Sequence, residues 1–167
     1  MADRLKSAGY VTGMVGKWGL GEYEPMRPYN RGFTETFWHP NGGVLFPDKT
    51  TGFISNLRRG AEKVQVAEYS TDAFGREAAE FIGRHQREPF FLYLAHSQPH
   101  VPLHVSARFR GKTARGLFGD VIEEIDWSVG QVLETLEKHQ LRNRTLVIFT
   151  SDNGPWLNYG DHAGSAR

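Results

Sequence analysis

Cysteine is absent from this chain of 167 residues, which excludes disulfides, thiolate zinc sites and cysteine nucleophiles within it. No apolar run reaches the length of about 18 residues that a membrane span needs, so we expect no membrane insertion. The formal net charge is only +1, which predicts no strong attraction to nucleic acid. The opening residues, MADRLKSAGY, lack the apolar core of a signal peptide. The remaining composition is typical of one globular domain.

Hydrophobic patterning divides the chain into alternating helices and strands. The unbroken apolar runs FFLYLA and TLVIF are typical of strands that are buried on both faces of a parallel sheet. A long segment rich in proline, glycine and aromatic residues shows no sustained period, and we interpret it as an ordered, irregular excursion with a few short strands. The predicted order is helix 2–8, strand 10–15, excursion 24–60, helix 70–85, strand 90–95, helix 119–139 and strand 145–149.

Local signals define the ends and faces of these helices. Gly9 is expected to end the first helix, and Ser70 or Thr71 to cap the second. Asp126 lies close to the apolar stripe of the third helix, so we interpret it as a paired structural carboxylate. That predicted stripe consists of Ile122, Ile125, Val129, Val132, Leu133 and Leu136.

The order of elements predicts an α/β fold with right-handed crossovers and a mostly parallel sheet, in a single domain over residues 1–167. In such a sheet the carboxyl ends of the strands share one edge, where ligands bind. We therefore expect the loops that follow the three strands to converge.

The first two loops carry basic side chains. Lys17 lies in VGKWGLG, where flanking glycines leave room for a ligand, although a solvated surface lysine is the alternative. The second loop, AHSQPHVPLH, has histidines at 96, 100 and 104, the spacing of a helical zinc site. Pro99 and Pro102 prevent a continuous helix there, so one imidazole acting as proton donor or anion ligand fits better.

The third loop offers hard oxygen ligands. Asp152 and Asn153 follow the predicted strand 145–149, and their side-chain oxygens suit Ca²⁺ or Mg²⁺. The alternative is a hairpin turn, but the residues after Gly154 do not alternate as a partner strand would. His162 lies in the same tail and either faces the same pocket or is an exposed loop histidine. A cation, a lysine and an imidazole together suit a tetrahedral oxyanion such as sulfate or phosphate.

Four motifs in this order resemble the sulfatase family of the alkaline-phosphatase-like superfamily. The family's second signature is similar to LKSAGYVTGMVGKWGLG, and the motif that follows it is similar to RGFTETF. The strand with its histidine loop is similar to PFFLYLAHSQPHVPL, and the helix with its metal-binding segment to DVIEEIDWSVGQVLETLEKHQLRNRTLVIFTSDNGPW. The resemblance implies a partial three-layer α/β sandwich and the hydrolysis of sulfate esters.

The resemblance also implies roles for single residues. Asp152 and Asn153 would be ligands of Ca²⁺, Lys17 would contact the sulfate, and His100 would lie on its leaving-group side. His162 is retained as a further candidate for substrate binding. The substrate would be a sulfated small molecule or carbohydrate, and family members are commonly exported, periplasmic or lysosomal.

Some parts of the family pattern are missing here. The family's nucleophile is a formylglycine made from a C/S-x-P-x-R motif, and neither this motif nor the early acidic metal ligands occur in the chain. Gly19 stands where many members have histidine. The resemblance therefore implies an internal piece of a longer sulfatase, inactive by itself and working with the remainder of that chain. A phosphodiesterase or phosphonate hydrolase of the same superfamily and a non-catalytic fragment are the alternatives.

Overall fold

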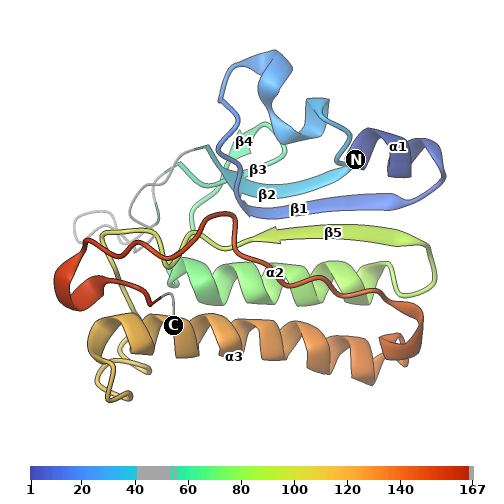
Figure 1. Cartoon of the computed structure of the whole chain (residues 1–167). Helices are drawn as coiled ribbons and strands as arrows, with labels where there is room; N and C mark the ends of the chain where they lie inside the picture. The colour runs from blue at the N-terminus through green and yellow to red at the C-terminus, as the bar shows by residue number, and fades with distance from the viewer. Residues whose placement is uncertain (41–53, 55, 166–167) are drawn as a thin grey trace.

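A five-stranded sheet in the order β4-β3-β2-β1-β5 forms the centre of the fold (Figure 1). The structure is a computed structural model that describes residues 1–40, 54 and 56–165. The strands are β1 (Val11–Lys17), β2 (Glu35–His39), β3 (Arg58–Arg59), β4 (Glu62–Lys63) and β5 (Phe90–Ala95). The helices are α1 (Ala2–Ser7), α2 (Ser70–Arg84) and α3 (Gly116–Lys138), with single 3-10 turns η1 (Glu24–Met26), η2 (Pro28–Asn30), η3 (Arg142–Arg144) and η4 (Gly160–His162).

The three longer strands run parallel, with β1 between β2 and β5. Only the short β3 and β4 pair antiparallel, beyond β2. The predicted α/β fold with a mostly parallel sheet is therefore confirmed, and β2 is one of the short strands expected within the excursion. Part of that excursion, residues 41–53 and 55, lies outside the described residues. Because β1, β2 and β5 are parallel, their carboxyl ends meet at one edge of the sheet.

Helices cover the sheet from both sides (Figure 1). On the side of α1, Met14 and Trp38 pack with Phe33. On the side of α2, Val15 and Phe37 pack against Phe74, which is fully buried. Successive residues of a strand point to opposite faces, so β1 and β2 each contribute to both cores. This is why these strands are almost entirely buried.

The predicted helix ends are partly right. At the end of α1, Gly9 has φ +87°, and the amide of Tyr10 donates to the carbonyl of Leu5, which is the glycine-ended closure expected from the sequence. At the start of α2 the capping prediction is wrong. The hydroxyl of Ser70 is buried without a hydrogen-bond partner in the described part of the chain, and α2 has no side-chain cap.

The buried face of α3 differs from the predicted stripe. Ile125 and Leu136 are buried as expected, but Ile122 is 41% exposed. The helix packs on α2 through a close approach in which a Cβ added at Gly75 would lie 2.5 Å from Oγ of Ser128. The buried residues of α3 include the polar Asp120, Glu124 and Ser128, which follow one another at a spacing of four residues and therefore share one helix face. The carboxylate predicted to be paired, Asp126, is instead exposed and makes no ion pair in the described residues.

The prediction of a buried strand over 145–149 is wrong. Residues 145–150 form no helix or strand, and Leu146 and Ile148 are 85% and 76% exposed. A strand needs a hydrogen-bonded neighbour, and no described residue pairs with the backbone of this segment. The prediction that β5 is a buried strand also needs correction. It is half exposed, because it forms an edge of the sheet with one paired side.

No helix in the described ranges combines the length and the hydrophobicity needed to cross a membrane.

Candidate functional site at the carboxyl edge of the sheet

Lys17 is the last residue of β1 and is half-buried at the carboxyl edge of the sheet. The residue before it, Gly16, has φ +111° and lies so close to β5 that a Cβ there would meet the carbonyl oxygen of Ala95. The residue after it, Trp18, donates its ring N–H to the carbonyl of Met26 at 2.7 Å. Both neighbours of Lys17 are therefore fixed, Gly16 by its close approach to β5 and Trp18 by its ring hydrogen bond. The side chain of Lys17 itself remains partly open to solvent.

His39, at the end of β2, is paired in register with Lys17. Its ring nitrogen Nε2 lies 2.7 Å from Oγ of Ser97, in the loop after β5, and both residues are buried. The imidazole also stacks in parallel on Phe74 of α2, with ring centroids 5.9 Å apart. This side-chain hydrogen bond links the ends of two strands across β1, the strand between them.

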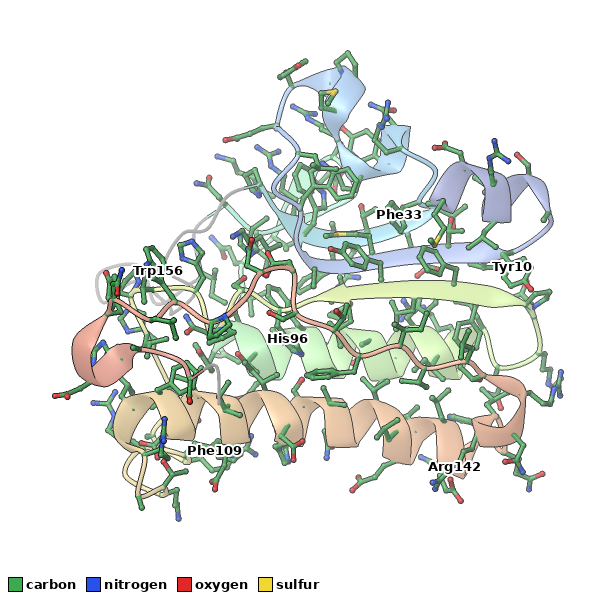
Figure 2. The ribbon with its side chains drawn as sticks, viewed as in Figure 1. Tyr10, Phe33, His96, Phe109, Arg142 and Trp156 are labelled. Atoms are coloured by element: carbon green, nitrogen blue, oxygen red, sulfur yellow. The ribbon has the colours of Figure 1, made fainter. Side chains whose placement is uncertain are left out.

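His96 is the first residue after β5, beside the carboxyl edge (Figure 2). Part of the residue is exposed, but both of its ring nitrogens are buried and lack a hydrogen-bond partner in the described part of the chain. Burial disfavours the charged imidazolium and lowers the pKa of His96 to about 4. His96 is therefore neutral at physiological pH.

The low pKa of His96 predicts a loss of stability in mild acid. In the unfolded chain the pKa of His96 returns to 6.5, so the unfolded state takes up the proton first as the pH falls. The free energy of unfolding should decrease between pH 6.5 and 4, by up to about 3 kcal/mol from this group. Urea unfolding at several pH values measures this free energy of unfolding. The His96→Leu variant should lose much less unfolding free energy between pH 6.5 and 4 than the wild type. Parallel pH profiles for the two proteins would show that His96 does not cause the loss.

His100 lies farther along the same loop and is exposed. Its Nδ1 is 2.6 Å from the carbonyl oxygen of Val101. Since a carbonyl only accepts hydrogen bonds, Nδ1 carries a proton and Nε2 is left to exchange a proton with a ligand. The ring of Trp156 meets that of His100 edge to face at 6.3 Å, which brings the tail after residue 150 next to this loop.

The predicted metal ligands Asp152 and Asn153 lie in that tail and are exposed. Nowhere in the described ranges do three or more His, Cys, Asp or Glu side chains gather as a metal site would require. Two side chains fall well short of the six to eight oxygens of a calcium ion. Asp152 and Asn153 by themselves therefore offer too few side-chain oxygens for a calcium ion.

His162 lies in η4 and lines a recess of about 510 Å³ between η4 and the start of α3. The other lining residues include Arg115, Phe118 and Asp161. Neither Lys17 nor His100 lines this recess, so the structure does not join His162 to the other candidates.

His39 and Ser97 are not among the site residues predicted from the sequence, yet both are buried and in contact at the point where the strand ends meet. A signal for His39 was present: the short segment Glu35–His39 follows Gly32 and ends in a polar residue, as β1 follows Gly9 and ends in Lys17. The irregular surroundings of this segment concealed it. Ser97 carried no signal of its own, since its role depends on contact with β2.

Residues 1–167 match the family model described as Sulfatase. The chain is 36% identical to human N-acetylgalactosamine-6-sulfatase over 94% of its own length and 33% of that protein. It is 30% identical to N-acetylgalactosamine-6-O-sulfatase of Bacteroides thetaiotaomicron, covering 96% of this chain and 43% of the relative. The chain thus spans between a third and a half of the length of these two relatives.

Solved structures share the fold. The PsFucS1 sulfatase from Pseudoalteromonas sp. matches 98% of this chain and 39% of its own with a TM-score of 0.82, at 23% identity. Ps i-CgsB, solved in complex with k-i-k-neocarrahexaose, matches 84% of this chain and 36% of its own with a TM-score of 0.76, at 29% identity. The mixed sheet and its helices are therefore an arrangement found in larger proteins.

Proposed function

Because this chain belongs to the sulfatase family, we propose that it supplies part of the catalytic domain of an enzyme that hydrolyses sulfate esters. The observation that carries the proposal is that Lys17 ends β1 and the His100 loop follows β5, its parallel neighbour, at the same edge of the sheet. This edge is where α/β proteins bind their ligands.

The two side chains have complementary roles in the proposed reaction. The ammonium group of Lys17 offsets the negative charge on the sulfate oxygens as the S–O bond breaks. His100 protonates the leaving oxygen through Nε2, because Nδ1 is held by the carbonyl of Val101. The exposed ring can reach an alcohol that leaves from the open side of the edge.

The proposed substrate is a sulfated carbohydrate. The two curated relatives are named for the 6-sulfate of N-acetylgalactosamine, and Ps i-CgsB was solved with a neocarrahexaose. The rings of the exposed Trp156 and Tyr159 lie 5.0 Å apart, and that of Trp156 also meets His100, so this tail offers apolar ring faces on which a sugar can stack.

The proposed partner is the remainder of a sulfatase domain. β5 has one unpaired edge, and the apolar segment 146–149 is exposed with an unpaired backbone in the described structure. Strands from the remainder of the domain would pair with the backbone of β5 and of segment 146–149 and would cover the exposed apolar side chains. The same remaining segment would carry the formylglycine nucleophile, which this chain does not encode.

We propose a calcium site only together with ligands from the remainder of the sulfatase domain. Asp152 and Asn153 would contribute two oxygen ligands, and residues of that remainder would supply the others. We therefore expect residues 1–167 alone to bind Ca²⁺ more weakly than about 100 μM, since most of the ligands are missing. Isothermal titration calorimetry measures this affinity. Micromolar binding that is lost in Asp152→Ala but kept in Asp161→Ala would show that the chain holds the ion by itself.

The activity is tested on the longer polypeptide that contains residues 1–167. Release of inorganic sulfate from an aryl sulfate and from N-acetylgalactosamine 6-sulfate is expected, with little release of phosphate from matched esters. Preferential cleavage of a phosphodiester or phosphonate would instead support that activity of the superfamily. If no C/S-x-P-x-R motif lies in frame upstream of Met1, the chain is better explained as a non-catalytic fragment.

A further inference from the structure

A buried hydrogen bond joins the end of β2, which pairs with the strand that carries Lys17, to the loop that carries His100. Nε2 of His39 and Oγ of Ser97 are 2.7 Å apart, and only 2% and 7% of these residues are exposed. His39 lies outside the motifs from which the proposed chemistry was derived, and Ser97 lies within the histidine loop but had no role assigned to it. Their contact spans 58 positions of sequence, so it is a feature of the tertiary structure.

On the side of β2, His39 is coupled to Lys17 through the backbone. The two residues are register partners, and the amide of Trp18 donates to the carbonyl of His39 at 3.0 Å. The imidazole cannot shift freely, because it stacks flat on the buried ring of Phe74. His39 is therefore a rigid support beside the candidate lysine.

On the side of β5, Ser97 is coupled to His100. The carbonyl of Ser97 accepts a hydrogen bond from the amide of His100 at 3.3 Å, which closes a turn between them. Residues 97 and 98 are buried, whereas residues 99 and 100 are exposed. Among the described residues, the Ser97 hydroxyl thus makes the last side-chain hydrogen bond between a buried residue of this loop and another element before the chain reaches His100.

We propose that the His39–Ser97 hydrogen bond is a positioning device that fixes the distance between Lys17 and His100. The proposal rests on the proposed function for its catalytic consequence, but the positioning itself is a property of the fold. A sulfate ester must contact the lysine and the imidazole together, so a loosened loop misplaces the proton donor. Misplacement by about 1 Å can lower a rate by about 100-fold.

The structural consequence is tested by hydrogen–deuterium exchange with mass spectrometry on residues 1–167. In Ser97→Ala we expect the amides of residues 96–104 to exchange at least about tenfold faster than in the wild type. The control is Ser128→Ala, which removes another buried serine hydroxyl, bonded to the carbonyl of Thr71 at 3.3 Å. Ser128→Ala should leave the exchange of amides 96–104 unchanged. Ser97→Thr keeps the hydroxyl, so these amides should exchange as slowly as in the wild type.

Unchanged exchange in Ser97→Ala, or equal acceleration in Ser97→Ala and Ser128→Ala, would overturn the proposal. If Ser97→Ala does not fold, His39→Phe removes the same hydrogen bond from the other side while keeping a flat ring against Phe74, and the same comparison applies.

The catalytic consequence is tested separately on the longer polypeptide. Ser97→Ala should lower kcat for sulfate release by about 10- to 100-fold with KM within about twofold, while Ser128→Ala keeps both constants. An unchanged kcat in Ser97→Ala would overturn the catalytic part of the proposal. Absence of sulfate release from the wild type would contradict the proposed function instead, and the exchange result would still stand.

Discussion

Replacing Lys17 by alanine is expected to reduce kcat/KM for sulfate release by at least about 100-fold in the polypeptide that contains this chain. A cationic group aimed at the developing charge of a transition state contributes on the order of 100- to 1,000-fold in rate. Lys17 can act in this way because its backbone is paired with His39 of β2 while its side chain is partly open. The rate of sulfate release from an aryl sulfate, measured at several substrate concentrations, gives the effect.

The control for this experiment is Lys63→Ala, which removes an exposed lysine from the short strand β4 at the far edge of the sheet. Lys63→Ala should leave kcat/KM within about twofold, because an exposed charge away from the site contributes little. Lys17→Arg keeps the charge but replaces a compact ammonium by a planar guanidinium, so only partial activity is expected. Full activity of Lys17→Ala would remove Lys17 from the proposed mechanism.

Replacing Gly16 by alanine is expected to lower the free energy of unfolding by about 2–5 kcal/mol. The new Cβ would lie 1.9 Å from the carbonyl oxygen of Ala95, and this oxygen belongs to the backbone of β5 and cannot rotate away. Gly16 also has φ +111°, a conformation that costs a residue with a side chain about 1–2 kcal/mol. Overlap in a packed interior adds about 1–3 kcal/mol. Urea unfolding of both proteins at neutral pH measures the difference.

Gly19→Ala separates the two contributions at Gly16. Gly19 also has a positive φ, +71°, but no atom lies within 4 Å of the position its Cβ would take. This variant should therefore lose only the conformational part, about 1–2 kcal/mol. Equal losses at both positions would show that the close approach of β1 to β5 does not limit substitution at Gly16.

Local sequence was sufficient to predict the elements whose residues interact with near neighbours. The helices α1, α2 and α3 and the strands β1 and β5 were predicted from periodicity, apolar runs and the terminating Gly9, with boundaries close to those observed. The parallel arrangement followed from the order of these elements. The sulfatase resemblance was likewise carried by motifs that are contiguous in the chain, and the family match confirms it.

Tertiary structure alone decided which sides of these elements are covered. The run at 145–149 has the composition of a buried strand, yet it is exposed, because a strand exists only where another backbone offers hydrogen bonds. The inward face of α3 was set by the close approach of Gly75 and Ser128. The pairing of His39 with Ser97 joins side chains from two strand ends on either side of β1, and no local pattern encodes such a contact. Propensity depends on neighbours along the chain, whereas burial and polar pairing depend on the segments that meet in space.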